Sequence, residues 1–185
     1  GKTGLVGTLK VGASKKSIGL RADMDALPME ELNTFAHKSK HPGCMHGCGH
    51  DGHTVMLLAA ARYLAQSRNF DGTVQFIFQP AEEANGSGSG AKAMIDDGLF
   101  DRFPVDNVFA MHNAPDLVAG AIATCPGAIM ASMDLFEVTL TGHGAHGAFP
   151  HMGIDPIIIA AQLLTAWQTI IGRNVNAQES AVISA

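Results

Sequence analysis

The sequence has few cysteines, few basic residues and no long apolar run. Its three cysteines, Cys44, Cys48 and Cys125, cannot all pair within one chain, which argues against a disulfide framework and favours a reducing compartment. Twelve Lys and Arg against seventeen Asp and Glu give a net charge of -5, without a basic run that could follow a phosphate backbone. The longest apolar stretches, 55–61 and 157–161, fall short of the ~20 residues of a membrane helix. We therefore expect a soluble, cytoplasmic globular protein that binds neither nucleic acid nor membrane.

Neither end of the sequence has the pattern of a natural terminus. The chain opens at Gly1 directly on a strand-like run, with no initiator Met before it. It closes on residues 180–185, which have the character of a strand entering a sheet. We expect the protein to continue beyond both ends.

Strand-like and helical runs alternate up to about residue 127, which predicts an α/β fold with a largely parallel central sheet flanked by helices. The predicted strands are 6–11, 17–21, 73–78 and 107–111. The first two could pair as a hairpin across 12–14, and the other two are continuously apolar, as buried strands are. A helix is predicted at 53–66, apolar nearly all round and therefore buried, and another at 91–97, ending at Gly98. The patch 85–90, of Asn, Gly and Ser, is predicted to be a loop beside a site.

Residues 128–185 predict a second unit of α+β type. The run 134–140 alternates like a half-buried antiparallel strand, and a loop rich in glycine and histidine follows. Asp155 and Pro156 are a good N-cap and first-turn pair for a helix that reaches about Gly172. Its inward face is predicted at positions that recur every three to four residues, namely 157, 160, 161, 164, 167 and 171.

The densest chemical signal lies in residues 45–53, where three histidines, one cysteine and one aspartate are separated by glycines. Thiolate and imidazole are ligands that divalent transition metals favour, and glycine spacers let the backbone aim two of them at one ion. A redox dithiol of Cys44 and Cys48 is disfavoured because the spacing is Cys-x3-Cys. A finger-type zinc site is disfavoured because no second pair follows downstream.

Further carboxylates and a histidine follow predicted strands. Glu82 and Glu83 follow a predicted buried strand and a proline. His112 follows a second predicted strand, and Asp23 and Asp25 lie at the end of a third. Ligand sites in open α/β sheets form at the carboxyl ends of parallel strands. Adjacent carboxylates there repel unless a cation relieves them, which a metal with one Glu as ligand and the other as base would do. Each motif alone also fits a solvated acidic turn or an ordinary core histidine, so the metal hypothesis depends on their combination.

Four ordered blocks, 20–28, 45–53, 78–83 and 144–151, together resemble the aminoacylase and carboxypeptidase family of dinuclear metallohydrolases. The resemblance is closest to its amidohydrolase branch, with hippurate hydrolases, N-acyl-amino-acid deacylases and plant indole-acetyl-amino-acid hydrolases. Residues 1–127 then resemble an incomplete metallopeptidase-like catalytic domain, and residues 128–185 the start of a lid and dimerisation domain. The departures are Gly47, usually Ala, and Cys44, commonly Lys.

The resemblance implies a set of ligands and a base. Two divalent ions, of manganese, zinc, cobalt or nickel, would be bound by the four residues Cys48, His50, Glu83 and His112. Glu82 would be the general base that serves a metal-activated water. The ligands would be oriented by hydrogen bonds to three residues that do not bind the ions themselves, Asp23, Asp25 and Asp51.

The second unit would supply substrate contacts. By resemblance, His146 hydrogen-bonds the substrate carbonyl or oxyanion, often across a dimer interface. Arg173 and Asn174 are candidates for binding the carboxylate of the substrate, by position and weak resemblance. A solvated cation at a helix C-terminus explains Arg173 equally well.

The expected function is metal-dependent hydrolysis of the amide bond of an N-acyl amino acid or short peptide, by a homodimer joined through the lid domain. Dipeptidase, carboxypeptidase and diaminopimelate deacylase activities, or a non-catalytic metal-binding relative, are the alternatives. The cysteine-containing block favours the amidohydrolase branch. Family members carry one further ligand histidine beyond position 185 and resume the catalytic fold after the lid, so we expect this chain alone to be inactive.

Overall fold

The computed structural model describes residues 2–84 and 88–185. Residues 85–87 of the loop predicted at 85–90 lie outside the described residues. The chain divides into two compact units, Gly1–Ile122 and Ala123–Ala185. The sequence pattern changes a few residues after this division, at about residue 128.

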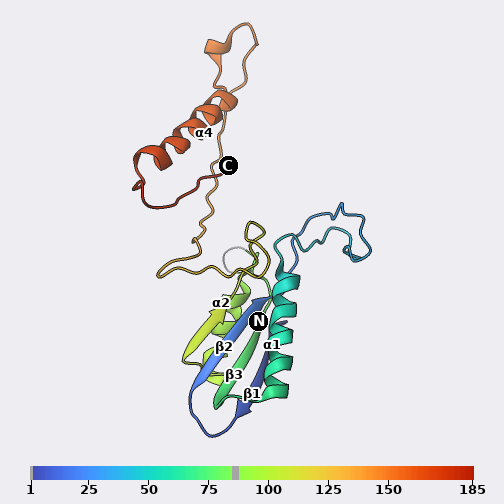
Figure 1. Ribbon diagram of the computed structural model, residues 1–185. Coiled ribbons are helices and arrows are strands. Elements are labelled where there is room, and N and C mark those ends of the chain that lie inside the picture. Colours follow the sequence, from blue (N-terminus) through green and yellow to red (C-terminus); the bar gives the residue numbers. More distant parts are fainter. Residues whose placement is uncertain (1, 85–87) are drawn as a thin grey trace. The chain divides into compact units, whose positions relative to one another are not determined.

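The first unit is built on a four-stranded sheet (Figure 1). Its strands are β1 (Leu5–Val11), β2 (Ser17–Asp23), β3 (Gly72–Gln79) and β4 (Asn107–Ala110), in the spatial order β1-β3-β2-β4. β2 is parallel to both of its neighbours, β3 and β4, whereas β1 is antiparallel to β3. The predicted α/β class with a largely parallel central sheet is confirmed.

The predicted hairpin between the first two strands is wrong, because β3 lies between them. β3 pairs with β1 on one side, where Leu5 is opposite Phe78, and with β2 on the other, where Ser17 is opposite Thr73. β3 is buried along nearly its whole length, and a central position gives hydrogen-bond partners to both edges of its backbone. A short loop at 12–14 suggested a hairpin, but the burial of the most apolar strand decided the order.

Helices cover both faces of this sheet. α1 (His50–Ser67) runs along one face, and α2 (Gly90–Asp96) and α3 (Leu99–Arg102) lie on the other (Figure 1). Gly98 follows α2 as predicted, with a left-handed φ of 80° that glycine adopts without strain.

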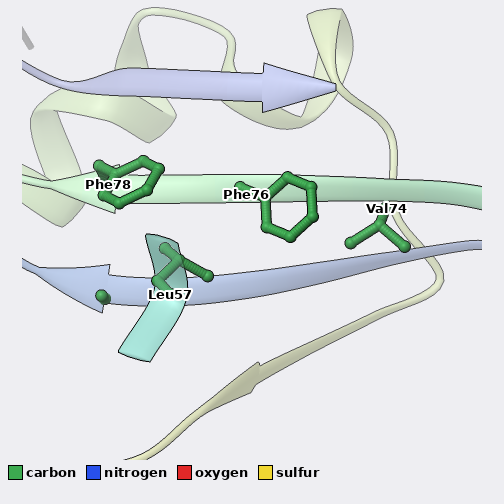
Figure 2. Packing of buried hydrophobic residues seen from close by; sticks show 5 residues of the cluster. Leu57, Val74, Phe76 and Phe78 are labelled. Carbon is green, nitrogen blue, oxygen red and sulfur yellow. The ribbon is translucent and has the colours of Figure 1, made fainter. Parts of the chain in front are cut away.

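The core divides between the two faces because successive side chains of a strand point to opposite sides. On one face, Leu57 of α1 packs against three side chains of β3, as Figure 2 shows: Val74, Phe76 and Phe78. On the other face, Ile77 packs against Met94 and Leu99 of the shorter helices. β3 therefore anchors both layers and fixes where its carboxyl end lies.

The prediction of a fully buried helix is wrong for α1. It begins at His50, one turn earlier than predicted, and only His50, His53 and Leu57 are buried along its length. Val55 and Tyr63 remain 64% and 69% exposed. Contact with a single sheet can bury only one stripe of a helix. Among the described residues, nothing covers the other stripes.

The second unit contains α4 (Pro156–Arg173) and a short 3-10 turn, η2 (Pro150–Met152). α4 starts as predicted, because the Asp155 carboxylate accepts a hydrogen bond from the Ile157 N–H at 2.9 Å. Its predicted inward face contains no buried residue, although Trp167 packs edge-on against Phe136. Within the described residues, no helix combines the length and apolar character needed to cross a bilayer.

The strands predicted at 134–140 and 180–185 are wrong, since neither segment forms a strand here. A strand exists only through hydrogen bonds to a neighbouring strand. In residues 123–185, all of which the structure describes, the sole β-bridge joins His143 to Ile154. The alternation of polar and apolar residues is present in 134–140, but no neighbouring strand in residues 123–185 pairs with it.

Candidate metal centre

The residues singled out in the first unit lie where its three mutually parallel strands end. Asp23 is the last residue of β2, Glu82 and Glu83 follow β3, and His112 follows β4. His50 is the first residue of α1. Because parallel strands end at the same edge of a sheet, residues far apart in sequence converge there.

Two residues with a left-handed backbone shape the loops around this edge. Gly49, the N-cap of α1, has a φ of 83°, and a Cβ at this position would collide with the Asn113 side chain. Ala81, just before Glu82, has a φ of 49°, which costs a non-glycine residue roughly 1–2 kcal/mol. Its carbonyl is held by the Gly90 N–H at 2.9 Å. Such strain is typical of functional loops, and here it sets the direction of the two glutamates.

The imidazoles of His50 and His112 are held in the same tautomer. Nδ1 of His50 donates to the Asp25 carbonyl at 3.0 Å, and Nδ1 of His112 donates to the Asn113 carbonyl at 2.7 Å. A neutral ring that donates from Nδ1 keeps a lone pair on Nε2. Nε2 of His112 lies 3.4 Å from Cys48 Sγ. Both rings therefore offer a nitrogen ligand, each oriented by a main-chain carbonyl, as is typical of metal-binding histidines.

Nε2 of His50 is buried and has no hydrogen-bond partner among the described residues. The carboxylate oxygens of Asp23 and Glu83 lie 3.7 Å away and that of Glu82 lies 3.9 Å away, too far for hydrogen bonds. A buried polar atom without a partner costs about 1–3 kcal/mol. A cation bound at this nitrogen would remove that cost, so the unsatisfied lone pair of His50 Nε2 fits the binding of a metal ion.

Of the three groups of potential ligand atoms that share His50 among the described residues, two contain the other predicted ligands. One joins Cys48, His50 and His112, and the other joins His50, Glu82 and Glu83, with the atoms of each group within 4.8 Å of one another. Thiol, imidazole and carboxylate together suit a divalent transition metal. The residues predicted as ligands are thus brought together.

Electrostatics at the site favour a bound cation. Burial raises the pKa of the Cys48 thiol, and the neighbouring Glu83 and Glu82 raise it further. Without a cation the thiol therefore keeps its proton, and a thiolate forms when positive charge balances the carboxylates.

The three aspartates predicted to support the ligands make different contacts. Asp25 accepts the Glu83 N–H on Oδ2 at 2.9 Å, while its carbonyl orients His50. Burial alone would raise the pKa of Asp25, but hydrogen bonds from the backbone of Glu83 and Glu82 outweigh it and lower the pKa. Asp25 thus holds a proposed imidazole ligand and the segment carrying both glutamates.

Asp23 bonds not to a predicted ligand but to His53, whose Nδ1 lies 2.6 Å from Oδ1. Burial would raise the pKa of Asp23, but this hydrogen bond and the charge of Arg21, at 2.9 Å, outweigh it and lower the pKa. Asp51 is exposed and lines a separate cavity of about 560 Å³ with His46 and Cys44. The potential ligand groups among the described residues do not include Asp51.

The predicted substrate-binding residues all belong to the second unit. His146 lies in an exposed loop, and its Nδ1 accepts a hydrogen bond from the Ala148 N–H at 3.1 Å. A neutral ring in that tautomer has its hydrogen on Nε2, which is then free to donate. Arg173 ends α4, and Asn174 caps it through a backbone bond to the Ile170 carbonyl. Both are exposed.

Sequence reasoning assigned no role to His53 or Asn113, yet both lie directly behind the cluster. The backbone N–H of Asn113 donates to Nε2 of His53 at 2.9 Å. The available signal was spacing, since His53 follows His50 by three residues and therefore shares its face of α1. Because the helix was predicted to begin at residue 53, this face was missed.

This arrangement defines an α/β protein with a thiol, imidazoles and carboxylates gathered at the carboxyl edge of a parallel sheet, a class in which such clusters bind transition metals. A family model described as Peptidase family M20/M25/M40 matches residues 19–183. The chain belongs to this family.

Individual relatives agree with this membership. Hippurate hydrolase of Campylobacter jejuni is 53% identical over 184 residues, which are 100% of this chain and 47% of the relative. The crystal structure of a putative aminohydrolase from methicillin-resistant Staphylococcus aureus matches 98% of this chain and 48% of its own, with 35% identity and a TM-score of 0.74. The crystal structure of a dinuclear metal-binding peptidase of the M20 family from Bacillus subtilis matches 63% of this chain and 31% of its own chain, with 43% identity and a TM-score of 0.58. The chain spans about half the length of the curated relatives it matches.

Proposed function

We propose that this chain is the metal-binding part of a hydrolase that cleaves the amide bond of N-acyl amino acids. The observation that carries the proposal is the convergence of Cys48, His112 and two glutamates around Nε2 of His50, which has no hydrogen-bond partner in the described part of the chain. The 53% identity to a hippurate hydrolase supports an N-acyl amino acid as substrate, because hippurate is an acylated glycine.

In this proposal Cys48, His50, Glu83 and His112 hold two divalent ions of manganese, zinc, cobalt or nickel. The likeness to a dinuclear metal-binding peptidase supports the number of ions. The chemistry that such ions supply is activation of water and polarisation of the amide carbonyl. Glu82 accepts the proton of the attacking water and delivers it to the departing nitrogen. Its side chain, 43% exposed, is the more open of the two glutamates, which suits a group that must reach water and substrate.

Residues of the second unit are proposed to donate hydrogen bonds to the substrate. His146 donates from Nε2 to the oxygen that becomes negative during attack, which suits the tautomer set by the Ala148 N–H. Arg173 and Asn174 bind the carboxylate of the amino acid. Exposure of Arg173 at the end of α4 supports this role, since the guanidinium can pair with a carboxylate through two parallel hydrogen bonds.

Measuring hydrolysis tests the function directly. The whole protein, loaded with Mn²⁺ or Co²⁺, is incubated with hippurate, N-acetyl and indole-acetyl amino acids, and dipeptides, and the released amine is quantified. We expect turnover of at least one N-acyl amino acid in preference to dipeptides, with loss of activity on chelation and recovery on adding metal. Hydrolysis of dipeptides alone would favour the peptidase alternative. Turnover that survives complete metal removal would reject the metal-dependent mechanism.

The whole protein is further proposed to be a cytoplasmic homodimer joined through residues 128–185. All three cysteines are free, which suits a reducing compartment. In the second unit, Leu135, Phe136 and Ile157 are 69%, 59% and 75% exposed, and apolar side chains in such number favour a partner surface. We expect sedimentation equilibrium of the whole protein to give twice the chain mass at micromolar concentration. A monomer throughout that range would contradict the dimer.

A further inference from the structure

His53 belongs to no ligand set proposed above, yet it is among the most buried polar side chains in the described part of the chain, at 2% exposure. Its ring centre lies 5.4 Å from that of His50 and 4.6 Å from that of His112. A buried imidazole this close to two candidate ligands requires an explanation beyond packing.

Both ring nitrogens of His53 have fixed partners. Nδ1 lies 2.6 Å from a carboxylate oxygen of Asp23, which can only accept, so Nδ1 carries the hydrogen. Nε2 accepts the backbone N–H of Asn113 at 2.9 Å, because a backbone N–H can only donate. Oδ1 of the Asn113 side chain also lies 2.9 Å from this nitrogen, and the side chain donates to it once the amide is turned to present its NH₂ group. Asp23 is itself held by Arg21 and keeps a charge. The ring therefore has one tautomer and one orientation.

Asn113, the partner of His53 Nε2, also forms a hydrogen bond with His112. The Asn113 residue that donates its N–H to His53 also accepts, on its carbonyl, the hydrogen of His112 Nδ1 at 2.7 Å. A continuous chain of hydrogen bonds thus runs from Asp23 at the end of β2, through His53 on α1, to His112 after β4. β4 pairs with β2, but residues 107–113 are all exposed, so little packing holds His112 in place.

We propose that His53 is a positioning residue, which fixes the Asn113 main chain and so aims Nε2 of His112 at the metal site. This inference rests on the proposed function for the identity of the bound ions. The positioning role itself does not depend on which reaction is catalysed. In this role His53 contacts no ion or substrate, and it raises metal affinity by ordering a ligand before the metal binds.

Two alternatives make different predictions. Asp23, His50 and His53 have ligand atoms within 4.8 Å of one another, so His53 could itself bind a metal. That role requires breaking one of its two hydrogen bonds and predicts one fewer ion at saturation when His53 is removed. A merely structural role predicts that metal affinity follows stability, whichever buried residue is changed.

The test compares cobalt binding by the whole protein with that of three variants, using chelator competition and ion counting. His53→Ala is expected to weaken Co²⁺ affinity about 10–100-fold without changing the number of ions at saturation. His53→Gln, whose amide oxygen can still accept the Asn113 N–H, should recover part of this loss. Leu57→Ala is the matched control, because Leu57 is buried on the same helix one turn further on and packs in the apolar cluster with β3. Its affinity should equal that of the parent.

Unchanged affinity in folded His53→Ala, a loss of one ion, or an equal loss in Leu57→Ala would each overturn the proposal. A metal-free measurement separates this outcome from failure of the proposed function. Ring ¹⁵N spectra of the apo protein should show His112 as a single Nδ1-protonated tautomer, which becomes a mixture in His53→Ala. If the protein hydrolyses no N-acyl amino acid but these spectra change as expected, the function is wrong and the positioning role stands. Unchanged His112 spectra reject the positioning role whatever the activity.

Discussion

Replacing Glu82 with Gln is expected to lower kcat for hydrolysis of an N-acyl amino acid by about 10²–10⁴-fold, the usual contribution of a general base. Gln preserves size and polarity but cannot accept the proton of water. KM should change little, because the substitution removes proton transfer and leaves binding in place. The measurement is steady-state hydrolysis of hippurate, or of the best substrate found, by the metal-loaded whole protein.

Metal content decides whether Glu82 is a base or a ligand, because its carboxylate lies in one group of potential ligand atoms with His50 and Glu83. We expect Glu82→Gln to retain both ions. Glu83→Gln is the matched control: the same chemical change one residue along should release metal. Turnover equal to that of the parent would eliminate Glu82 as the base. If Glu82→Gln lost an ion and Glu83→Gln retained both, Glu82 would be the metal ligand and Glu83 the general base.

Cys48→Ser is expected to weaken metal binding by more than about 100-fold, beyond the usual effect of residues that only support ligands. Serine replaces a soft thiolate with a neutral hydroxyl, and removes the negative charge that a cation would otherwise stabilise. Titration with Co²⁺ measures the affinity. The sulfur-to-cobalt absorption band of the parent should be absent from the variant.

Cys125→Ser provides the control for this substitution. Cys125 is also free and is exposed in the second unit, where its thiol donates to the Ala128 carbonyl. The same atom exchange there should leave both affinity and spectrum unchanged. If Cys48→Ser bound cobalt as tightly as Cys125→Ser, the thiol would not be a ligand and the metal centre would need a different set.

Several features of the site followed from the sequence because they depend on local order. A buried apolar strand followed by Pro80 and two glutamates places carboxylates at a strand end, and the structure has them there. Glycine spacers around Cys48 were predicted to let the backbone aim two ligands at one ion, and Gly49 has the left-handed conformation at a position where a side chain would collide with Asn113. Asp155 and Pro156 predicted the start of α4 through capping, which involves only neighbouring residues.

Other features depended on which segments become neighbours. The order of the strands could not be read from a short loop at 12–14, since the central position of β3 reflects burial on both faces. The alternating runs 134–140 and 180–185 do not form strands, because hydrogen bonds of a sheet need a second strand beside them. α1 is buried only along the stripe that meets the sheet, because a helix buries only the face that another element covers.

The amino-acid sequence by itself determined the chemistry that this protein offers: a thiol, imidazoles and carboxylates, several of them at the end of an apolar strand. Only the tertiary structure decided how they are connected. It brought His53 between Asp23 and Asn113. Within the described ranges 2–84 and 88–185, it left Nε2 of His50 without a hydrogen-bond partner and Asp51 outside every group of potential ligands. The physical reason is that residue type and local pattern are encoded nearby in the chain, whereas hydrogen bonds between residues 30 to 60 positions apart exist only once the sheet and helix have packed.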